Sequence, residues 1–98
     1  MISLIDKKIV QNIAKKYKVR RVYLFGSQIQ NSSRKPKDID LAVEGVAPEQ
    51  FFLFYTELYD RLSQPVDLID LEQKSLFSRL VKKEGVLLYG QPQSARRR

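Results

Sequence analysis

Two aspartates that stand two residues apart are the first feature of this chain that could do chemistry. Asp38 and Asp40 lie in segment 38–43, where apolar and polar side chains alternate as they do in a strand with one buried face. Side chains two apart on a strand point to the same face, with Cα atoms about 6.6 Å apart. Two carboxylates this close repel each other, and a bound divalent metal ion relieves the repulsion. The spacing therefore predicts a metal site.

A glycine and a serine precede this pair at the other end of a polar loop. Gly26 and Ser27 follow the apolar run 22–25, and residues 28–37 separate them from Asp38. A glycine directly after a buried strand lets the backbone turn tightly and lets a phosphate approach closely, and the serine adds a hydroxyl and an amide. One end of the loop therefore suits a phosphate group, and the other end suits a metal ion.

Taken together, these residues resemble a known signature. The segment 26–40 resembles the G-S-x10-D-x-D signature of the polymerase β-like nucleotidyltransferase superfamily. It begins with Gly26 and Ser27, continues with ten intervening residues and ends with the D-I-D run that holds both aspartates. The short chain is similar to the minimal nucleotidyltransferase (MNT) branch, and the resemblance covers most of residues 19–90. It implies that Gly26 and Ser27 bind the nucleotide and that Asp38 and Asp40 bind Mg²⁺, with two ions in the site.

The third carboxylate of the site is Asp67 by the same resemblance, on the strand-like segment 65–71. The three aspartates are thereby implied as metal ligands and as catalytic residues, and Asp67 is also suited to act as a general base. An aspartate at the end of a strand is often a turn or helix cap, and that alternative stays open for Asp67. Asp70 could be such a cap: by alternation it shares a face with Val66 and Leu68, whereas Asp67 does not.

Three residues depart from the family pattern, and one of them is Lys37, which stands where a small serine or threonine usually precedes the D-x-D run. Many members continue the motif as G-S-x-A-R-G, whereas this chain has Gln30 and Asn31 where the arginine and the second glycine stand. The usual basic contact to phosphate is therefore absent from its family position. Arg34, Lys35 and Lys37 either compensate electrostatically or form a solvated loop, and the sequence favours neither interpretation.

Composition narrows the chemistry further. The chain of 98 residues, 43% of them hydrophobic, is large enough for one core, and it contains neither cysteine nor histidine. Disulfides, thiolate ligands, Ser-His-Asp triads and imidazole bases are thereby excluded, which leaves carboxylates as ligands and bases. Oxygen-only ligation suits Mg²⁺, with Mn²⁺ as the alternative. The sequence has no apolar run of about 20 residues and no secretory signal, so a cytoplasmic protein that does not enter the membrane is expected.

The net charge of +7 is distributed unevenly along the chain. Basic residues are concentrated in the first segment and at the end, in residues 96–98. Between positions 38 and 72 the sequence has nine acidic residues and only one basic residue, Arg61. An acidic centre of this kind fits a metal site better than a uniform nucleic-acid surface does, so specific nucleic-acid binding is not expected.

Hydrophobic periodicity predicts the element order α-β-β-α-β-α-β. The first helix is expected to begin after Ser3, which forms a capping box with Asp6, and the last to be capped by Gly85. The fold class is α/β (α+β), a small mixed sheet flanked by helices in the polymerase β-like arrangement that the resemblance implies. Residues 1–90 are assigned to the nucleotidyltransferase domain, and residues 91–98 are expected to be a mobile basic tail. The predicted elements are helix 4–17, strand 20–25, strand 38–43, helix 48–62, strand 66–70, a helix over 76–83 and strand 86–89.

Phe52 and Tyr59 lie off the apolar stripe of the second helix, seven residues apart and nearly superposed along it. They are either ordinary aromatics at the edge of the core, which the pattern slightly favours, or part of a partner surface. A domain of this size has little room for both a nucleotide and an acceptor pocket, so the acceptor hydroxyl is expected to arrive on another macromolecule that docks over the metal site. The second interpretation makes these two aromatics its anchors.

The resemblance implies a metal-dependent nucleotidyltransferase that moves a nucleoside monophosphate, AMP from ATP, onto a hydroxyl of a partner protein. Members of this branch are typically antitoxins paired with HEPN-domain ribonuclease toxins, so a HEPN-type toxin is the implied partner. The alternative is a non-catalytic antitoxin that blocks its toxin by forming a complex, which the missing arginine and glycine keep open. A basic nucleic-acid-binding protein is a third class, but no binding motif supports it. Self-association as a homo-oligomer is left open.

Overall fold

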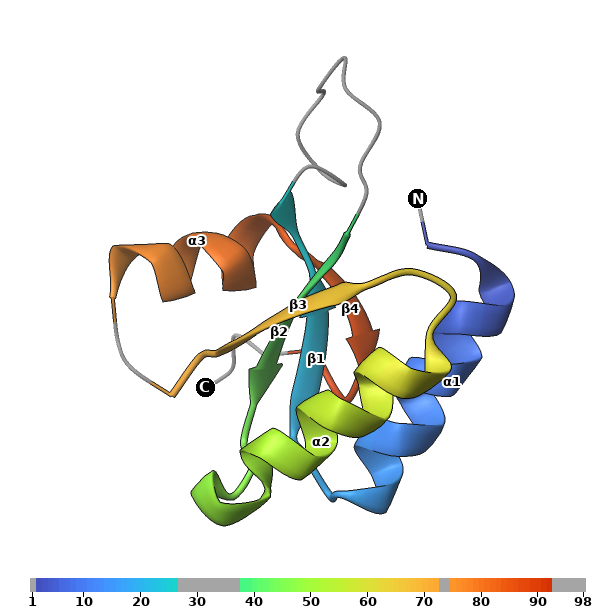
Figure 1. Cartoon of the computed structure of the whole chain (residues 1–98). Coiled ribbons are helices and arrows are strands. Elements are labelled where there is room, and N and C mark those ends of the chain that lie inside the picture. Colours follow the sequence, from blue (N-terminus) through green and yellow to red (C-terminus); the bar gives the residue numbers. More distant parts are fainter. Residues whose placement is uncertain (1, 27–37, 73–74, 93–98) are drawn as a thin grey trace.

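The computed structural model describes residues 2–26, 38–72 and 75–92, which form a four-stranded mixed sheet with helices on both faces (Figure 1). The element order is the predicted one, and the boundaries lie within one residue of those expected. The predicted α/β (α+β) class with a small mixed sheet is therefore confirmed. The elements are α1 (Leu4–Lys16), β1 (Arg21–Leu24), β2 (Ile39–Glu44), α2 (Pro48–Arg61), β3 (Val66–Asp70), α3 (Leu76–Glu84) and β4 (Val86–Tyr89).

The strands lie in the order β3-β2-β1-β4. β1 is antiparallel to both β2 and β4, whereas β2 and β3 are parallel. Parallel neighbouring strands need a crossover connection. α2 provides it, because this helix lies between β2 and β3 in the sequence and packs against the sheet. The crossover makes β3 the direct neighbour of β2, which is the strand that carries Asp40.

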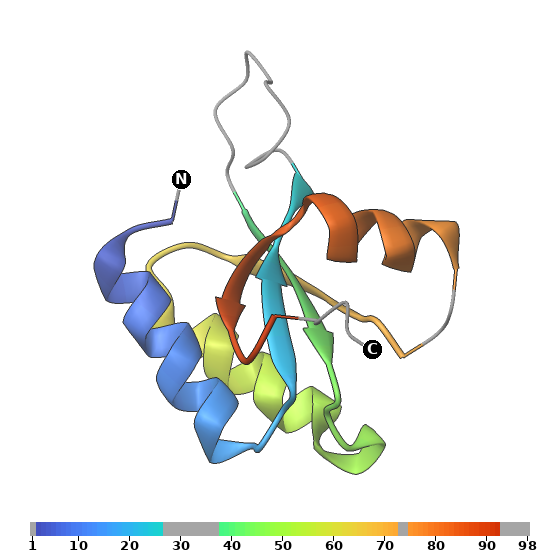
Figure 2. The same cartoon turned by 180° about the vertical axis from the view of Figure 1, so that it is seen from behind.

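One face of the sheet is covered by α1 and α2, which lie side by side on it (Figures 1 and 2). Phe54 and Leu58 of α2 are fully buried, as expected from the apolar stripe of that helix. Burying a side chain of this size contributes about 1.5–3 kcal/mol. The strands contribute alternate residues to the same core, which is the pattern of a sheet with one face turned inward. These strand residues are Val22, Leu24, Ile39, Leu41, Val43, Val66, Leu68 and Leu88.

Ser3 caps α1, as predicted, because its hydroxyl oxygen accepts a hydrogen bond from the Asp6 amide at 3.1 Å. The reciprocal bond of the predicted capping box is not formed, because the Asp6 carboxylate binds Ser63 instead. The Asp6 carboxylate is buried and accepts two hydrogen bonds from Ser63, one from the amide at 3.1 Å and one from Oγ at 2.5 Å. These bonds attach the start of α1 to the segment that follows α2. α1 is thereby fixed at its N-terminal end as well as through its buried apolar residues Val10, Ile13 and Ala14.

Among the described elements, α3 alone lies on the opposite face of the sheet (Figures 1 and 2). Ser75 caps it by accepting a hydrogen bond from the Ser78 amide at 3.1 Å, and Gly85 is its C-terminal cap, as predicted. The contact with the sheet is a second, smaller core, so this face is covered only in part. The buried residues of that core are Tyr23, Ala42, Leu71 and Val81.

The apolar stripe of α3 is mostly exposed. Val81 is buried against the sheet, but Leu76, Phe77 and Leu80 are 77%, 48% and 50% exposed. Periodicity in a sequence shows that a helix has an apolar side, but it does not show what covers that side. Within the described residues, no helix is long and apolar enough to span a membrane.

Phe52 and Tyr59 of α2 are 75% and 55% exposed. The slightly favoured interpretation, in which they are aromatics at the edge of the core, is therefore wrong. They belong to a helix that covers the face opposite α3 (Figures 1 and 2). Their use as partner anchors stays a prediction.

Candidate active site

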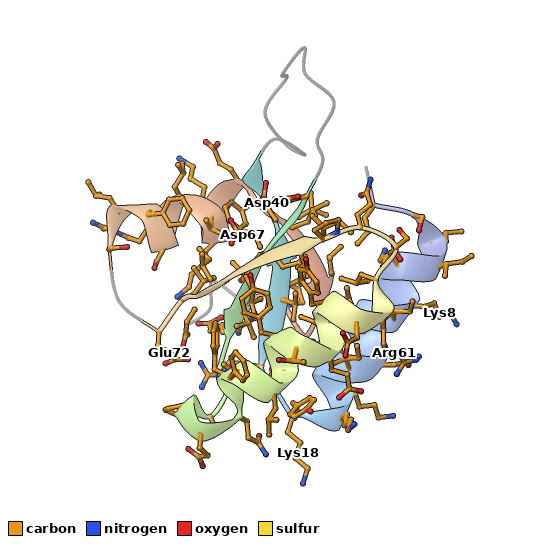
Figure 3. The ribbon with its side chains drawn as sticks, in the orientation of Figure 1. Lys8, Lys18, Asp40, Arg61, Asp67 and Glu72 are labelled. Carbon is orange, nitrogen blue, oxygen red and sulfur yellow. The ribbon has the colours of Figure 1, made fainter. Side chains whose placement is uncertain are left out.

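Asp40 and Asp67 stand directly opposite each other on neighbouring strands. β2 and β3 are parallel, and their register pairs Asp40 with Asp67. Neighbouring strands lie about 4.8 Å apart, and paired residues point to the same face. That face carries α3, since Ala42, two residues after Asp40, packs in the small core beneath this helix. Figure 3 shows the two aspartates near each other and beside α3.

Asp38 lies just outside β2, at an exposed position two residues before Asp40. Within residues 2–26, 38–72 and 75–92, no group of three or more acidic side chains is arranged so that it could hold a metal ion. The structure therefore brings Asp40 and Asp67 together and leaves Asp38 at the border of the strand. The role of Asp38 as a ligand stays a prediction.

Asp67 and Asp70 have different surroundings. Asp67 is exposed in the middle of β3, and no described residue forms a hydrogen bond or an ion pair with its carboxylate. Asp70 ends the strand, and its Oδ1 atom accepts a hydrogen bond from the Glu72 amide at 3.0 Å. The cap interpretation is therefore wrong for Asp67 and confirmed for Asp70.

Gly26 follows β1 at the point where the chain approaches Asp40. Its φ of 81° lies in the left-handed region, which residues with a Cβ atom rarely adopt. A Cβ atom at this position would overlap Oδ2 of Asp40 and lie 2.8 Å from its Cγ. The neighbouring amide of Phe25 donates to the Asp40 carbonyl oxygen at 3.0 Å. The glycine thus leaves the space that the Asp40 carboxylate occupies, and the turn and the aspartate form one unit.

Ser27 lies outside the described residues, as does the rest of the loop over 27–37. The role of Ser27 in binding the nucleotide therefore stays a prediction. The same holds for the departures from the family pattern at Gln30 and Asn31. It also holds for the basic residues Arg34, Lys35 and Lys37.

An aromatic pair connects this corner to α3. The rings of Phe25 and Phe77 meet edge to face, with centroids 5.6 Å apart and an interplanar angle of 80°. Pairs in this geometry contribute about 0.5–1.5 kcal/mol beyond their buried area. Because Phe25 directly precedes Gly26, the first turn of α3 is held against the strand end that bears the glycine. α3 is therefore one wall of the site.

Glu44 lies at the far end of β2, on the same face as Asp40, and it is almost fully buried. Its Oε1 atom accepts a hydrogen bond from Arg21 Nη1 at 2.6 Å, and its Oε2 atom lies 3.2 Å from Lys82 Nζ. Arg20 Nη1 is 3.7 Å from Oε2. This carboxylate therefore ties β1 and α3 to β2, and the three surrounding cations leave it unsuited to bind a metal ion.

The protonation of Glu44 follows from these contacts. Burial acts to raise the pKa of this carboxyl, but the hydrogen bonds from Arg21 and Lys82 outweigh burial and hold the pKa below its usual value. Burial, together with the nearby negative charge of Glu44, raises the pKa of the Tyr23 hydroxyl. The sequence interpretation did not single out Glu44, although the alternation that joins Asp38 and Asp40 extends to it through Ala42.

The donor set of Asp40 and Asp67 fits a divalent metal ion. Carboxylate oxygens are the ligands that hard cations such as Mg²⁺ take from proteins, and water or phosphate oxygens complete the coordination. The exposure of Asp67 and the partial exposure of Asp40 leave both accessible from the solvent side. Paired aspartates beside a glycine turn are typical of enzymes that transfer phosphoryl or nucleotidyl groups with the help of metal ions.

The chain belongs to the polymerase β nucleotidyltransferase family, whose model matches residues 7–94. The match begins within α1, at residue 7, and extends over the other six elements in full. Together with the structural neighbours described next, it confirms a nucleotidyltransferase of the MNT type. Nucleotidyltransferases of this fold generally use divalent metal ions, in agreement with the donor set. No curated protein matches the chain.

Several solved structures share this fold. A chain in a crystal structure of a toxin–antitoxin with AMP-PNP is 29% identical, with 90% of this chain and 75% of that chain covered and a TM-score of 0.68. A structure of a tri-AMPylated Shewanella oneidensis HEPN toxin in complex with its MNT antitoxin gives 25% identity, coverages of 89% and 71% and a TM-score of 0.66. A toxin–antitoxin mutant of MntA–HepT with two aspartates changed to glutamate gives 26% identity, coverages of 88% and 73% and a TM-score of 0.66.

Proposed function

We propose that this chain transfers AMP from ATP to a hydroxyl group of a partner protein, and that the partner is a HEPN-type toxin. The chain is then the antitoxin of the pair and silences the toxin by covalent modification. The observation that carries the proposal is the pair of Asp40 and Asp67, in register beside Gly26 on a partly open face of the sheet. The likeness to a complex with AMP-PNP and to a tri-AMPylated HEPN toxin supports the choice of nucleotide and acceptor.

In this proposal Asp38, Asp40 and Asp67 hold the metal, which is two Mg²⁺ ions with Mn²⁺ as the alternative. When bound, the metal neutralises charge on the phosphates and makes the acceptor hydroxyl more acidic. Gly26 and Ser27 bind the phosphates, since a position without a Cβ atom lets the backbone come close to them. Asp67, which is exposed in mid-strand, accepts the proton of the acceptor hydroxyl.

The reaction exchanges one bond to phosphorus for another. The acceptor oxygen bonds to the α-phosphorus of ATP, and the bond from that phosphorus to the oxygen bridging to the β-phosphate breaks. Pyrophosphate leaves with the electron pair of the broken bond. The proton of the hydroxyl passes to the Asp67 carboxylate and then to solvent. No oxidant or reductant takes part.

The test is incubation of the chain with ATP labelled at the α-phosphate and with the protein encoded beside it, which the proposal expects to be a HEPN-type toxin. The wild-type chain is expected to label the partner in the presence of Mg²⁺ and not in the presence of EDTA. Asp40→Asn and Asp67→Asn should each lower the rate of labelling at least about 100-fold, because each removes a charged ligand. Asp70→Asn is the matched control. Its side chain serves a turn that asparagine can also make, so transfer should stay within about twofold.

Undiminished transfer by the Asp40 or Asp67 variant would reject this site. A wild-type chain that labels nothing, but forms a complex in which the partner's ribonuclease activity is blocked, would replace the proposal by the non-catalytic alternative. The sequence feature behind that alternative is the presence of Gln30 and Asn31 at the positions of the family's arginine and glycine.

A further inference from the structure

The exposed side of α3 is an unusual surface for so short a helix. We call Leu76, Phe77 and Leu80 the α3 flank. Residues three and four apart on a helix are neighbours, so these three side chains lie together on one side of it. Each is about half exposed or more, although apolar side chains exposed in a cluster are uncommon on proteins that have no partner. The α3 flank is therefore a candidate contact surface.

The charges beside the α3 flank are mostly positive. Arg79, Lys82 and Lys83 belong to α3, against a single acidic residue, Glu84. Lys82 is engaged with Glu44, whereas neither Arg79 nor Lys83 forms an ion pair with any described residue. Two copies meeting through this same surface would bring like charges together, which opposes association. Charge complementarity favours a partner segment that carries carboxylates.

The position of the α3 flank links it to the aspartates. Phe77 packs edge to face on Phe25, and the Phe25 amide donates to the carbonyl oxygen of Asp40. α3 lies on the same face of the sheet as Asp40 and Asp67, as Figure 3 shows. α1 and α2, with the exposed aromatics of α2, cover the other face. A protein bound on α3 is therefore beside the aspartates, whereas one bound on α2 has the sheet between it and them.

We propose that the α3 flank is the docking surface for the protein that accepts AMP, and that it binds an acceptor segment combining apolar side chains with carboxylates. The inference rests on the proposed function, because it names the surface that brings the acceptor to the same site. The apolar side chains of the acceptor cover Leu76 and Leu80, and its carboxylates pair with Arg79 and Lys83. Docking there places the acceptor hydroxyl at the edge of the site formed by Asp40 and Asp67.

The test uses the full chain and the protein encoded beside it, which the proposed function expects to be a HEPN-type toxin. Leu80→Ser and Arg79→Glu alter the apolar and the charged part of the surface, and Leu76→Ser is a second apolar variant at a more exposed position. The matched controls are Leu4→Ser and Lys8→Glu, which make the same two kinds of change at exposed positions of α1, the helix on the opposite face of the sheet from α3 (Figures 1 and 2). Calorimetry measures the Kd for the partner and for ATP with Mg²⁺, and the labelling assay measures KM and kcat.

The α3 variants are expected to raise the Kd and the KM for the partner at least about tenfold, since truncating an anchor or reversing a charge at an interface has effects of this size. The Kd for ATP, the melting temperature and kcat at saturating partner should stay near those of the wild type. The two controls should change the Kd for the partner less than about twofold.

Several results would overturn the inference. Unchanged partner affinity in the folded α3 variants, or an equal loss in the α1 controls, would show that the partner binds elsewhere. A loss of ATP affinity would assign the α3 flank to the nucleotide. If light scattering showed that the isolated α3 variants differ in mass from the isolated wild-type chain, the α3 flank would be assigned to self-association. A wild-type chain that binds its partner through α3 but transfers no AMP would reject the proposed function and keep the docking surface.

Discussion

Gly26 is constrained both by its backbone angle and by the side chain beside it. Replacement with alanine would force a residue with a Cβ atom into the left-handed region, where φ is 81°. It would also place a methyl group in the space of the Asp40 carboxylate. The backbone strain costs about 1–2 kcal/mol. Displacement of Asp40 should cost more in function, so Gly26→Ala is expected to weaken binding of ATP with Mg²⁺ at least about tenfold. Calorimetry of nucleotide binding and urea unfolding measure the two effects.

Gly45→Ala is the control for the strain at Gly26. Gly45 has a φ of 89°, and its added Cβ would lie 2.7 Å from the Cβ of Arg20, away from the two aspartates. This variant should lose a similar amount of unfolding free energy and keep its affinity for ATP. If both variants lost nucleotide affinity equally, the loss would come from general destabilisation, and the turn at Gly26 would have no separate role.

The pairing of Asp40 with Asp67 could be predicted from the sequence only in part. Alternation in 38–43 shows that Asp40 faces away from the core, and the family resemblance suggests Asp67 as its companion. The register is set by tertiary structure, because the apolar neighbours Leu41 and Leu68 must face the same core. A slip of one residue would turn Asp67 to the buried side. Local pattern cannot supply this relation between strands joined through a helix.

At the level of elements, strands and helices were predictable wherever apolar residues repeat with a clear period. β3 and β4 have the expected bounds, and the cap residues Ser3 and Gly85 fulfil their predicted roles. The part that could not be predicted is how much of each apolar side is covered. α3 follows the helical pattern as well as α2 does, yet it lies on a sheet face that holds a small core, so most of its stripe meets solvent.

Glu44 is the main electrostatic contact between α3 and the sheet, and its contribution should depend on pH. The hydrogen bonds from Arg21 and Lys82 overcome the effect of burial and lower the pKa of this carboxyl in the folded state. A group with a lowered pKa stabilises the fold above its unfolded pKa, about 4.3 for glutamate, and loses that contribution as the pH falls through the folded pKa. Glu44→Gln should therefore cost about 2 kcal/mol at pH 7 and progressively less below about pH 4.

Urea unfolding of the wild type and Glu44→Gln at pH 7 and at pH 3.5 measures this difference. Glu57→Gln is the matched control, because Glu57 pairs with Lys16 and Arg61, whose side chains are exposed, and glutamine can still accept the hydrogen bond that the Tyr17 hydroxyl donates to Glu57. Its loss at pH 7 should be smaller than that of the Glu44 variant. A loss at Glu44 that is the same at both pH values would show that packing, rather than the ionised carboxylate, holds α3 in place.

At the level of the whole molecule, the two faces of the sheet differ in how much of each is covered by helices. The face under α1 and α2 holds the large core and carries most of the buried apolar surface. The other face has a small core beneath α3, and its remaining part carries Asp40 and Asp67. A fully covered sheet would gain stability and lose access to the aspartates. The uneven division of the core therefore leaves Asp67 exposed and Asp40 partly exposed.

The C-terminal end of the described chain takes part in this arrangement through one backbone contact. Arg21, which holds Glu44 through Nη1, also donates from Nε to the carbonyl oxygen of Gln91 at 2.6 Å. Deletion of residues 91–98 removes that acceptor, whereas deletion of residues 93–98 keeps it and removes the three terminal arginines. Deletion of 93–98 should leave the melting temperature and the rate of AMP transfer close to those of the full chain. Deletion of 91–98 should cost about 0.5–1 kcal/mol, or a few degrees in melting temperature, and keep transfer.

Thermal unfolding and the labelling assay on the two shortened chains check this last prediction, with Arg21→Lys as a companion variant. Lysine keeps the positive charge but lacks the fork that reaches Glu44 and Gln91 together, so it should lose at least as much stability as the longer deletion does. Transfer that disappears with either deletion while the fold is retained would contradict the assignment of residues 91–98 to a region outside the nucleotidyltransferase domain. It would place part of the acceptor or nucleotide contact there instead.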